Sequence, residues 1–132
     1  MTHLVFTYGT LKRGYGNHRL LDGARFVSLA MTLRPFHVEC VGFPIAYKSG
    51  PDMLRVIGEV YEVTDEQLAR LDRLEGTPTH YQRERVRVAC LGAGSQTVWM
   101  YVQQDARRGY HGRPCPIVGN TYEWSHHDQR PR

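Results

Sequence analysis

The stretch MLRVIGEVYEVTDEQLARLDRLEG, residues 53–76, joins a strand pattern directly to a helix pattern. Its first half alternates with a period of two residues, which is the side-chain repeat of a β-strand. Both faces of this strand are apolar: one holds Leu54, Val56, Gly58 and Val60, and the other holds Ile57, Tyr61 and Val63. Apolar residues on both faces are typical of a strand in a closed or covered sheet, so we expect this strand to lie in the core.

The second half of the stretch carries the signals of one well-bounded helix. Thr64 and Gln67 have the spacing of a capping box, which starts a helix by pairing each side chain with the other residue's backbone N–H. An apolar stripe with helical spacing follows, formed by Leu68, Leu71 and Leu74. Gly76 stands where a glycine commonly ends a helix, and Pro78 prevents its continuation.

Short strand-like segments, separated by glycine and proline, make up most of the remaining chain. They are found at residues 4–8, 24–40, 43–50, 81–91 and 96–104. Pro35 should interrupt the second of these, and residues 92–95 should join the last two as an antiparallel hairpin. Residues 16–24 indicate a brief helical turn. Because no repeat or linker divides the chain, we expect one α+β domain over residues 1–132 with a strongly curved, barrel-like sheet.

Composition and charge narrow the class of protein. Apolar residues make up 41% and charged residues 23% of the chain, which is near the norm for soluble globular proteins. No window approaches the roughly 18 apolar residues of a membrane span, and the first residues lack the basic and apolar regions of a signal peptide. We therefore expect a cytoplasmic protein without membrane association. The formal charge is +4, but without a long basic run or an RNA-binding motif we expect no nucleic-acid partner.

Metal and redox chemistry find little support in the residues. The chain contains three cysteines, which are far apart and lack the spacing of metal ligands: Cys40, Cys90 and Cys115. Buried free thiols are therefore expected rather than disulfides or a zinc site. The His-His-Asp run at residues 126–128 could bind a metal ion, but a solvated tail explains it better. We expect neither a metal ion nor a cofactor.

Glu75 breaks a local rule of helix chemistry. It is the last helical residue before Gly76, where the helix carbonyls leave a partial negative charge that disfavours a carboxylate. If the site is also apolar, desolvation raises the carboxyl pKa toward the range that suits general acid–base catalysis. The alternative is an ordinary terminal glutamate that Arg70 or Arg73 neutralises. No serine nucleophile elbow, phosphate-binding loop or dinucleotide motif is present, so a carboxylate acid/base is the remaining chemistry.

Two motifs in a fixed order resemble the γ-glutamyl cyclotransferase superfamily, in particular its γ-glutamylamine cyclotransferase and AIG2-like branch. They are YGTLKRG, residues 8–14, after the first strand, and LDRLEGTPTHYQRERV, residues 71–86, which includes the end of the helix. GFPIAY, residues 42–47, is similar to a short glycine-x-proline strand that this family carries between them. The resemblance extends from about residue 5 to residue 101. It implies a small mixed β-barrel with flanking short helices and a cavity at one end.

The resemblance also implies a reaction and its residues. In this family the substrate's own α-amine attacks its γ-carbonyl, which releases 5-oxoproline and the amine that had been attached. The resemblance places Glu75 as the acid/base. It also implies a binding turn that comprises Tyr8, Gly9, Thr10 and Leu11. Backbone N–H groups of this turn would hold the γ-glutamyl unit. Gly9 would allow close approach of the ligand to the backbone.

Tyr81 is a candidate donor in the cavity wall, with a packed aromatic residue as the alternative. Arg83 shares a strand face with two further arginines, for which a solvated charged face is the simpler interpretation.

We therefore expect a cofactor-free γ-glutamyl cyclotransferase that acts on a γ-glutamylamine or a related γ-glutamyl amide. Its partner would be this small-molecule substrate, and the protein would be a monomer or a weak homodimer. The alternative is a non-catalytic small-molecule-binding or interaction module that retained the cavity. Product formation distinguishes the two. The leaving amine and the role of residues 113–132 are not indicated by the sequence.

Overall fold

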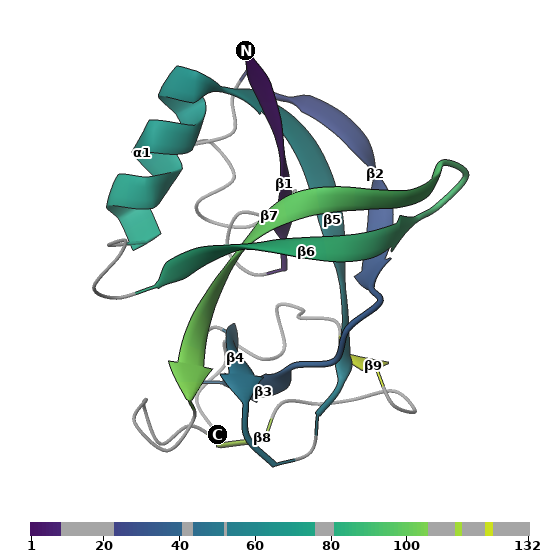
Figure 1. The fold of residues 1–132 in the computed structure, drawn as a ribbon, viewed down its shortest axis with the longest axis vertical. Helices are drawn as coiled ribbons and strands as arrows, with labels where there is room; N and C mark the ends of the chain where they lie inside the picture. The colour runs from purple at the N-terminus through teal and green to yellow at the C-terminus, as the bar shows by residue number, and fades with distance from the viewer. Residues whose placement is uncertain are drawn as a thin grey trace.

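The structure, a computed structural model, describes residues 1–8, 23–40, 44–51, 53–75, 81–105, 113–114 and 121–122. The described part forms a curved sheet with one helix (Figure 1). In chain order the elements are β1 (Thr2–Thr7), β2 (Arg25–Thr32), β3 (His37–Cys40), β4 (Pro44–Ser49), β5 (Arg55–Thr64), α1 (Asp65–Glu75), β6 (Gln82–Cys90), β7 (Gly94–Asp105), β8 (Arg113–Pro114) and β9 (Thr121–Tyr122). The predicted α+β class is confirmed. The helix in the described part is too short and too polar to cross a membrane.

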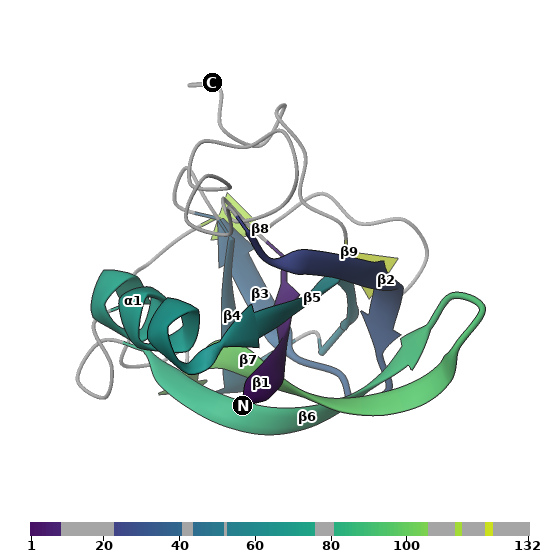
Figure 2. The same ribbon diagram turned by 90° about the horizontal axis from the view of Figure 1, so that it is seen from above.

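Five of the strands pair into a closed ring in the order β1, β5, β2, β6, β7. The ring closes through a parallel pairing of β1 with β7 at Val5 and Trp99. In the view from above, β6 curves along the lower edge of the picture next to β1, while α1 lies along one flank (Figure 2). Beyond the ring, β7 pairs in parallel with β4, which continues through β3 to β8. The expected strongly curved, mixed sheet is therefore confirmed as a ring of strands.

The two apolar faces of β5 are buried for different reasons. Val56 and Val60 belong to a buried cluster to which all five strands of the ring contribute, so they face the ring interior. Tyr61 and Val63 belong to a second cluster that also contains apolar residues of α1, so they face the helix. The position of β5 between two paired neighbours and two covered faces explains its continuous apolar pattern.

The start of α1 confirms the predicted capping box. The backbone N–H of Thr64 donates to Oε1 of Gln67 at 2.8 Å, and the backbone N–H of Gln67 donates to Oγ1 of Thr64 at 3.1 Å. The predicted apolar stripe is confirmed at Leu68 and Leu71, which are buried, but is wrong at Leu74, which is 43% exposed. Leu74 lies at the edge of the buried helix face because α1 has 3.6 residues per turn. The predicted helix stop at residues 76 and 78 lies outside the described residues.

The strand boundaries follow the glycine and proline signals. The second predicted segment is split around Pro35, since β2 ends at Thr32 and β3 begins at His37. The β6–β7 hairpin is confirmed with a loop of residues 91–93, because position 95 already pairs with Ala89 inside the ladder. Gly92 and Gly94 have positive φ angles of 77° and 68°, which explains why glycine occupies this turn. The helical turn expected at residues 16–24 lies largely outside the described part of the chain.

The cysteine prediction is confirmed where the structure describes a thiol. Cys90 is buried and free, and it belongs to the cluster inside the ring. The side chains of Cys40 and Cys115 lie outside the described residues.

A contact at the start of α1 predicts how stability changes with pH. A hydrogen bond with His3 lowers the pKa of Asp65 below its ordinary 3.8, and the positive charge of the Met1 amino terminus adds to the effect. A depressed folded-state pKa contributes stability above the unfolded pKa, and this stability is lost as the pH falls through the folded pKa. The difference in urea unfolding midpoint between wild type and Asp65→Asn should therefore be largest near neutral pH and should shrink below about pH 4.

The cause of this pH dependence can be checked in a second background. In His3→Gln, the Asp65→Asn substitution should produce a smaller pH-dependent difference in the unfolding midpoint, because the hydrogen bond that lowers the pKa is gone. A difference that is the same at pH 3 and pH 7 in the wild-type background would contradict the assignment.

Candidate active site

The predicted site residues come from three segments of the fold. Tyr8 directly follows β1, Glu75 is the last residue of α1, and Tyr81 directly precedes β6. Gly9, Thr10 and Leu11 lie outside the described residues, and Glu75 is described in its backbone only. The contacts of Tyr8, of Tyr81 and of the last two turns of α1 show how the described parts of these segments pack against the sheet.

Tyr8 fixes the point at which the chain leaves β1. Its hydroxyl donates a hydrogen bond to the backbone carbonyl of Tyr101 at 2.7 Å and accepts one from the backbone N–H of Ala46 at 3.2 Å. The side chain is buried, and its two hydrogen bonds connect the end of β1 with β7 and β4. Because the phenol proton is engaged by a backbone carbonyl, the residue anchors the start of the predicted turn.

Glu75 occupies a distinctive position on α1. It lies seven residues after Leu68 and four after Leu71, and both leucines are buried in the cluster between the helix and the sheet. Positions with this spacing share one face of an α-helix. Position 75 therefore combines the C-terminal end of the helix with the helix face that packs on the sheet. Carbonyl groups at the C-terminal end of a helix disfavour a negative charge there.

Tyr81 lies at the base of the same helix. It is 8% exposed and belongs to the apolar cluster that contains Leu71 of α1, Tyr47 of β4 and Tyr101 of β7. These surroundings agree with the interpretation of Tyr81 as a packed aromatic residue. Its role as a donor to a ligand stays a prediction.

A polar contact that the sequence pattern did not reveal joins α1 to the sheet. The hydroxyl of Tyr101 donates to Oδ1 of Asp72 at 2.6 Å, and Nη1 of Arg83 donates to the same carboxylate at 3.0 and 3.3 Å. The side chains of Asp72 and Arg83 are each 27% exposed. Arg83 is thus partly exposed and paired with Asp72, while Arg85 and Arg87 on the same strand face are exposed. One indication in the sequence that Asp72 could belong to the site was its place three positions before Glu75, which makes the two residues neighbours on the helix surface.

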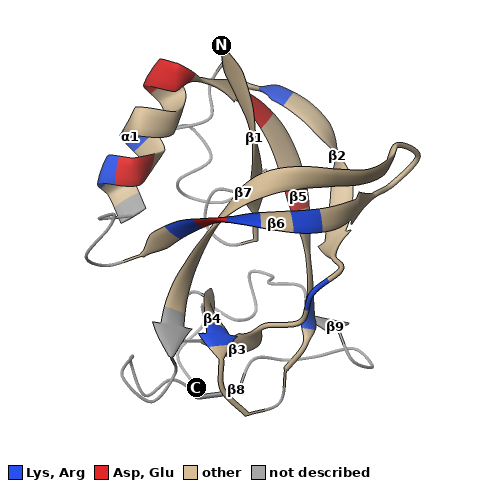
Figure 3. Cartoon of the chain, viewed as in Figure 1, with Lys and Arg blue, Asp and Glu red and all other residues tan. Residues whose placement is uncertain are grey.

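The basic face of β6 is only partly solvated. Figure 3 shows basic positions recurring along this strand. The guanidinium carbons of Arg83 and Arg85 lie 4.4 and 4.5 Å from the centre of the Trp99 ring, a geometry suited to cation–π attraction. Within the described residues, no group of three or more histidine, cysteine or acidic side chains is arranged to hold a metal ion.

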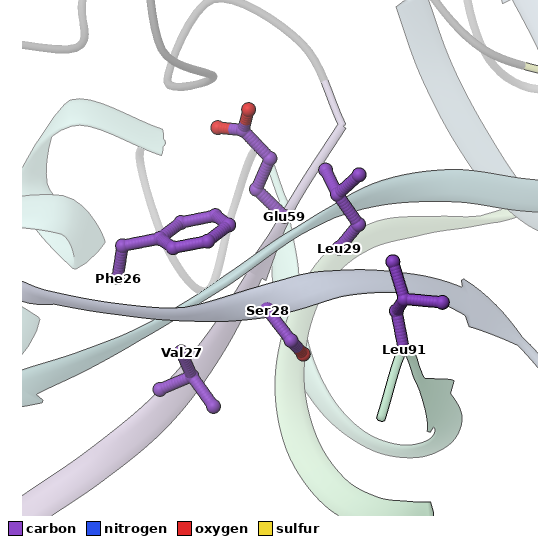
Figure 4. A pocket seen from close by; sticks show the side chains of 6 residues that line it. All are labelled: Phe26, Val27, Ser28, Leu29, Glu59 and Leu91. Carbon is purple, nitrogen blue, oxygen red and sulfur yellow. The ribbon is translucent and has the colours of Figure 1, made fainter. Parts of the chain in front are cut away.

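A separate pocket of about 420 Å³ lies beside β2 (Figure 4). It is lined by Phe26, Val27, Ser28, Leu29, Glu59 and Leu91. The pairing of β2 with β5 shifts register between Phe26 and Ser28, which indicates a bulge at this point. Glu59 and Ser28 point to opposite sides of β2, so their polar groups do not converge on one ligand (Figure 4). We assign no chemistry to this pocket.

Comparison with known proteins gives one consistent family. The family model described as "Gamma-glutamyl cyclotransferase, AIG2-like" matches residues 5–125. A gamma-glutamylaminecyclotransferase from Bos taurus is 45% identical over 96 residues, which is 67% of this chain and 57% of the relative. Its counterpart in Homo sapiens is 43% identical over 97 residues, which is 67% of this chain and 63% of the relative. This chain therefore spans about three fifths of the length of these two relatives.

A solved structure agrees in fold. The crystal structure of an AIG2-like protein from Mus musculus matches with a TM-score of 0.70 and 28% sequence identity. The match covers 90% of this chain and 98% of the mouse chain.

Proposed function

Because the chain belongs to the gamma-glutamyl cyclotransferase, AIG2-like family, we propose that it converts a γ-glutamylamine, or a related γ-glutamyl amide, into 5-oxoproline and a free amine. The observation that carries this proposal is the position of Glu75 at the C-terminal end of α1, on the helix face that buries Leu68 and Leu71. The carbonyl groups at a helix C-terminus favour proton uptake by a carboxylate placed there, which is what the reaction needs. The names of the bovine and human relatives support the same substrate class.

The proposed reaction moves two protons from the attacking nitrogen to the leaving nitrogen. The substrate's α-ammonium first gives a proton to the Glu75 carboxylate, and the free amine then attacks the γ-carbonyl carbon. A C–N bond forms within the substrate, and the C–N bond to the leaving amine breaks. Glu75 returns that proton to the leaving nitrogen. The ring nitrogen loses its second proton as the lactam forms, and this proton also passes to the released amine, which leaves as an ammonium ion, so no water is consumed. Ring closure is intramolecular, and the protein contributes chiefly by holding a reactive conformation.

The turn of residues 8–11 is the proposed binding element for the γ-glutamyl unit. Its backbone N–H groups would bind the α-carboxylate or the oxyanion that develops on the γ-carbonyl. The described contacts of Tyr8 support this assignment, because they fix the chain where it enters the turn. Tyr81 would complete the wall of the cavity. The cofactor-free reaction, the cytoplasmic location and the monomeric or weakly dimeric state remain predictions from the sequence.

Product analysis tests the proposed function. Purified protein would be incubated with γ-glutamyl-ε-lysine and a panel of other γ-glutamyl amides in ¹⁸O-labelled water, and products would be followed by mass spectrometry against enzyme-free samples. We expect unlabelled 5-oxoproline and the free amine in equal amounts, because the nucleophile is the substrate's own amine. Free glutamate carrying solvent oxygen would indicate hydrolysis. Saturable binding without product would indicate a binding module.

A further inference from the structure

The two halves of the proposed site are attached to the same residue of β7. Tyr101 holds Tyr8 through its backbone carbonyl and Asp72 of α1 through its phenol. We propose that Tyr101 and Asp72 are positioning residues that set the last turn of α1, and with it Glu75, relative to the turn that follows Tyr8; this inference rests on the proposed function.

The backbone contact of Tyr101 fixes the binding side of the site. The Tyr8 hydroxyl donates to the Tyr101 carbonyl at 2.7 Å across 93 residues of sequence. The Ala46 N–H donates to the same hydroxyl, so β4 also takes part. No side-chain atom of Tyr101 is needed for this contact. A substitution that removes only the Tyr101 phenol oxygen therefore leaves this half of the site in place.

The side-chain contact of Tyr101 fixes the proposed catalytic side. The Tyr101 hydroxyl lies 2.6 Å from Oδ1 of Asp72, within the range of a short charge-assisted hydrogen bond. Arg83 is the register partner of Tyr101 on β6 and donates to both oxygens of the Asp72 carboxylate. Tyr101 and Arg83, which are neighbours across the strand pair, thus hold one carboxylate on the helix.

The hydrogen bonds to Asp72 restrict rotation and sliding of α1 more than its apolar packing does. Leu68 and Leu71 bury the helix against the sheet, but apolar contact is non-directional and leaves small rotations and shifts of the helix inexpensive. Hydrogen bonds to Asp72 limit those motions at a position three residues before Glu75. Because a displacement of about 1 Å can cost on the order of 10²-fold in rate, this limit bears directly on catalysis.

The split between kcat and KM tests the inference. Tyr101→Phe should lower kcat by about tenfold and leave KM within about twofold, because the helix turn loses its tether while the binding turn keeps the Tyr101 carbonyl. Tyr8→Phe should instead act mainly on KM, because it frees the start of the binding turn. Tyr61→Phe is a matched control, since its hydroxyl also donates to a buried carboxylate, that of Glu59 at 3.0 Å, and it should leave kcat and KM unchanged.

A second substitution keeps the test decisive if Tyr101→Phe folds poorly. Asp72→Asn retains an acceptor for the Tyr101 hydroxyl, whereas Asp72→Ala removes it, so Asp72→Asn should retain more of the wild-type kcat. Thermal unfolding of each variant would test whether a smaller folded fraction, rather than a misplaced helix end, lowers kcat.

The outcomes separate the inference from the proposed function. An active wild type whose Tyr101→Phe variant has unchanged kcat, or a changed KM only, would overturn the positioning role alone. Equal losses in Tyr101→Phe and Tyr61→Phe would also overturn it, because they would indicate a general effect on the fold. A folded wild type that forms no 5-oxoproline would overturn the proposed function and the positioning role together.

Discussion

Replacing Glu75 with glutamine is expected to lower kcat for 5-oxoproline release by about 10²–10⁴-fold, the usual contribution of a general acid–base group. Glutamine keeps the size and most of the shape of the side chain but cannot accept the proton of the substrate's α-ammonium. KM should change much less than kcat, because binding of the γ-glutamyl unit is assigned to the turn at residues 8–11. Steady-state kinetics with mass-spectrometric detection of 5-oxoproline would measure both parameters.

The stability of the same variant separates a catalytic role from a structural one. Glu75→Gln removes a negative charge from the C-terminal end of α1, where the helix dipole disfavours it, so thermal stability should stay the same or rise slightly. Glu66→Gln provides a matched control, because Glu66 is an exposed glutamate in the first turn of the same helix and should retain full activity. Wild-type turnover by a folded Glu75→Gln protein would exclude Glu75 as the acid/base.

Replacing Gly58 with alanine is expected to be the most damaging small substitution in the sheet. A Cβ at this position would lie 2.2 Å from the backbone carbonyl oxygen of Thr7 and within 3.0 Å of the Phe6 ring. A backbone carbonyl in a paired strand cannot move aside cheaply, so we expect a loss of about 3 kcal/mol in the free energy of unfolding, the upper part of the usual range for over-packing. This corresponds to a melting temperature about 10 °C lower for a domain of this size.

Gly58→Ala should also affect the proposed site. The strand that must shift is the end of β1, which directly precedes Tyr8 and the predicted binding turn. Activity measured well below the melting temperature should therefore fall together with stability. Gly92→Ala is the control, because its Cβ would meet nothing within 4 Å and only the positive φ of 77° is unfavourable. Left-handed backbone costs about 1–2 kcal/mol for alanine, so a Gly92→Ala protein less stable than Gly58→Ala would contradict the assigned clash.

Local signals in the sequence were sufficient to predict α1 and the strands β1 to β7, but not β8 and β9. The capping box of Thr64 and Gln67, the break at Pro35 and the glycine turn of the β6–β7 hairpin each depend on a few neighbouring residues, and each is found in the structure. Glu75 was singled out in the same way, from its place at a helix end. Family motifs then supplied a reaction that fits such a carboxylate.

The sequence by itself thus determined α1, the strands β1 to β7, the two-sided burial of β5 and the family, because periodicity, caps and motifs depend on contiguous residues. Tertiary structure alone decided the closure of the ring between Val5 and Trp99 and the attachment of Tyr101 to both Tyr8 and Asp72. It also decided the exposure of Leu74 and the need for glycine at position 58. These features depend on which distant segments meet, and Tyr8 and Tyr101 are 93 residues apart. Such partners are chosen by the packing of the whole sheet, which no local spacing encodes.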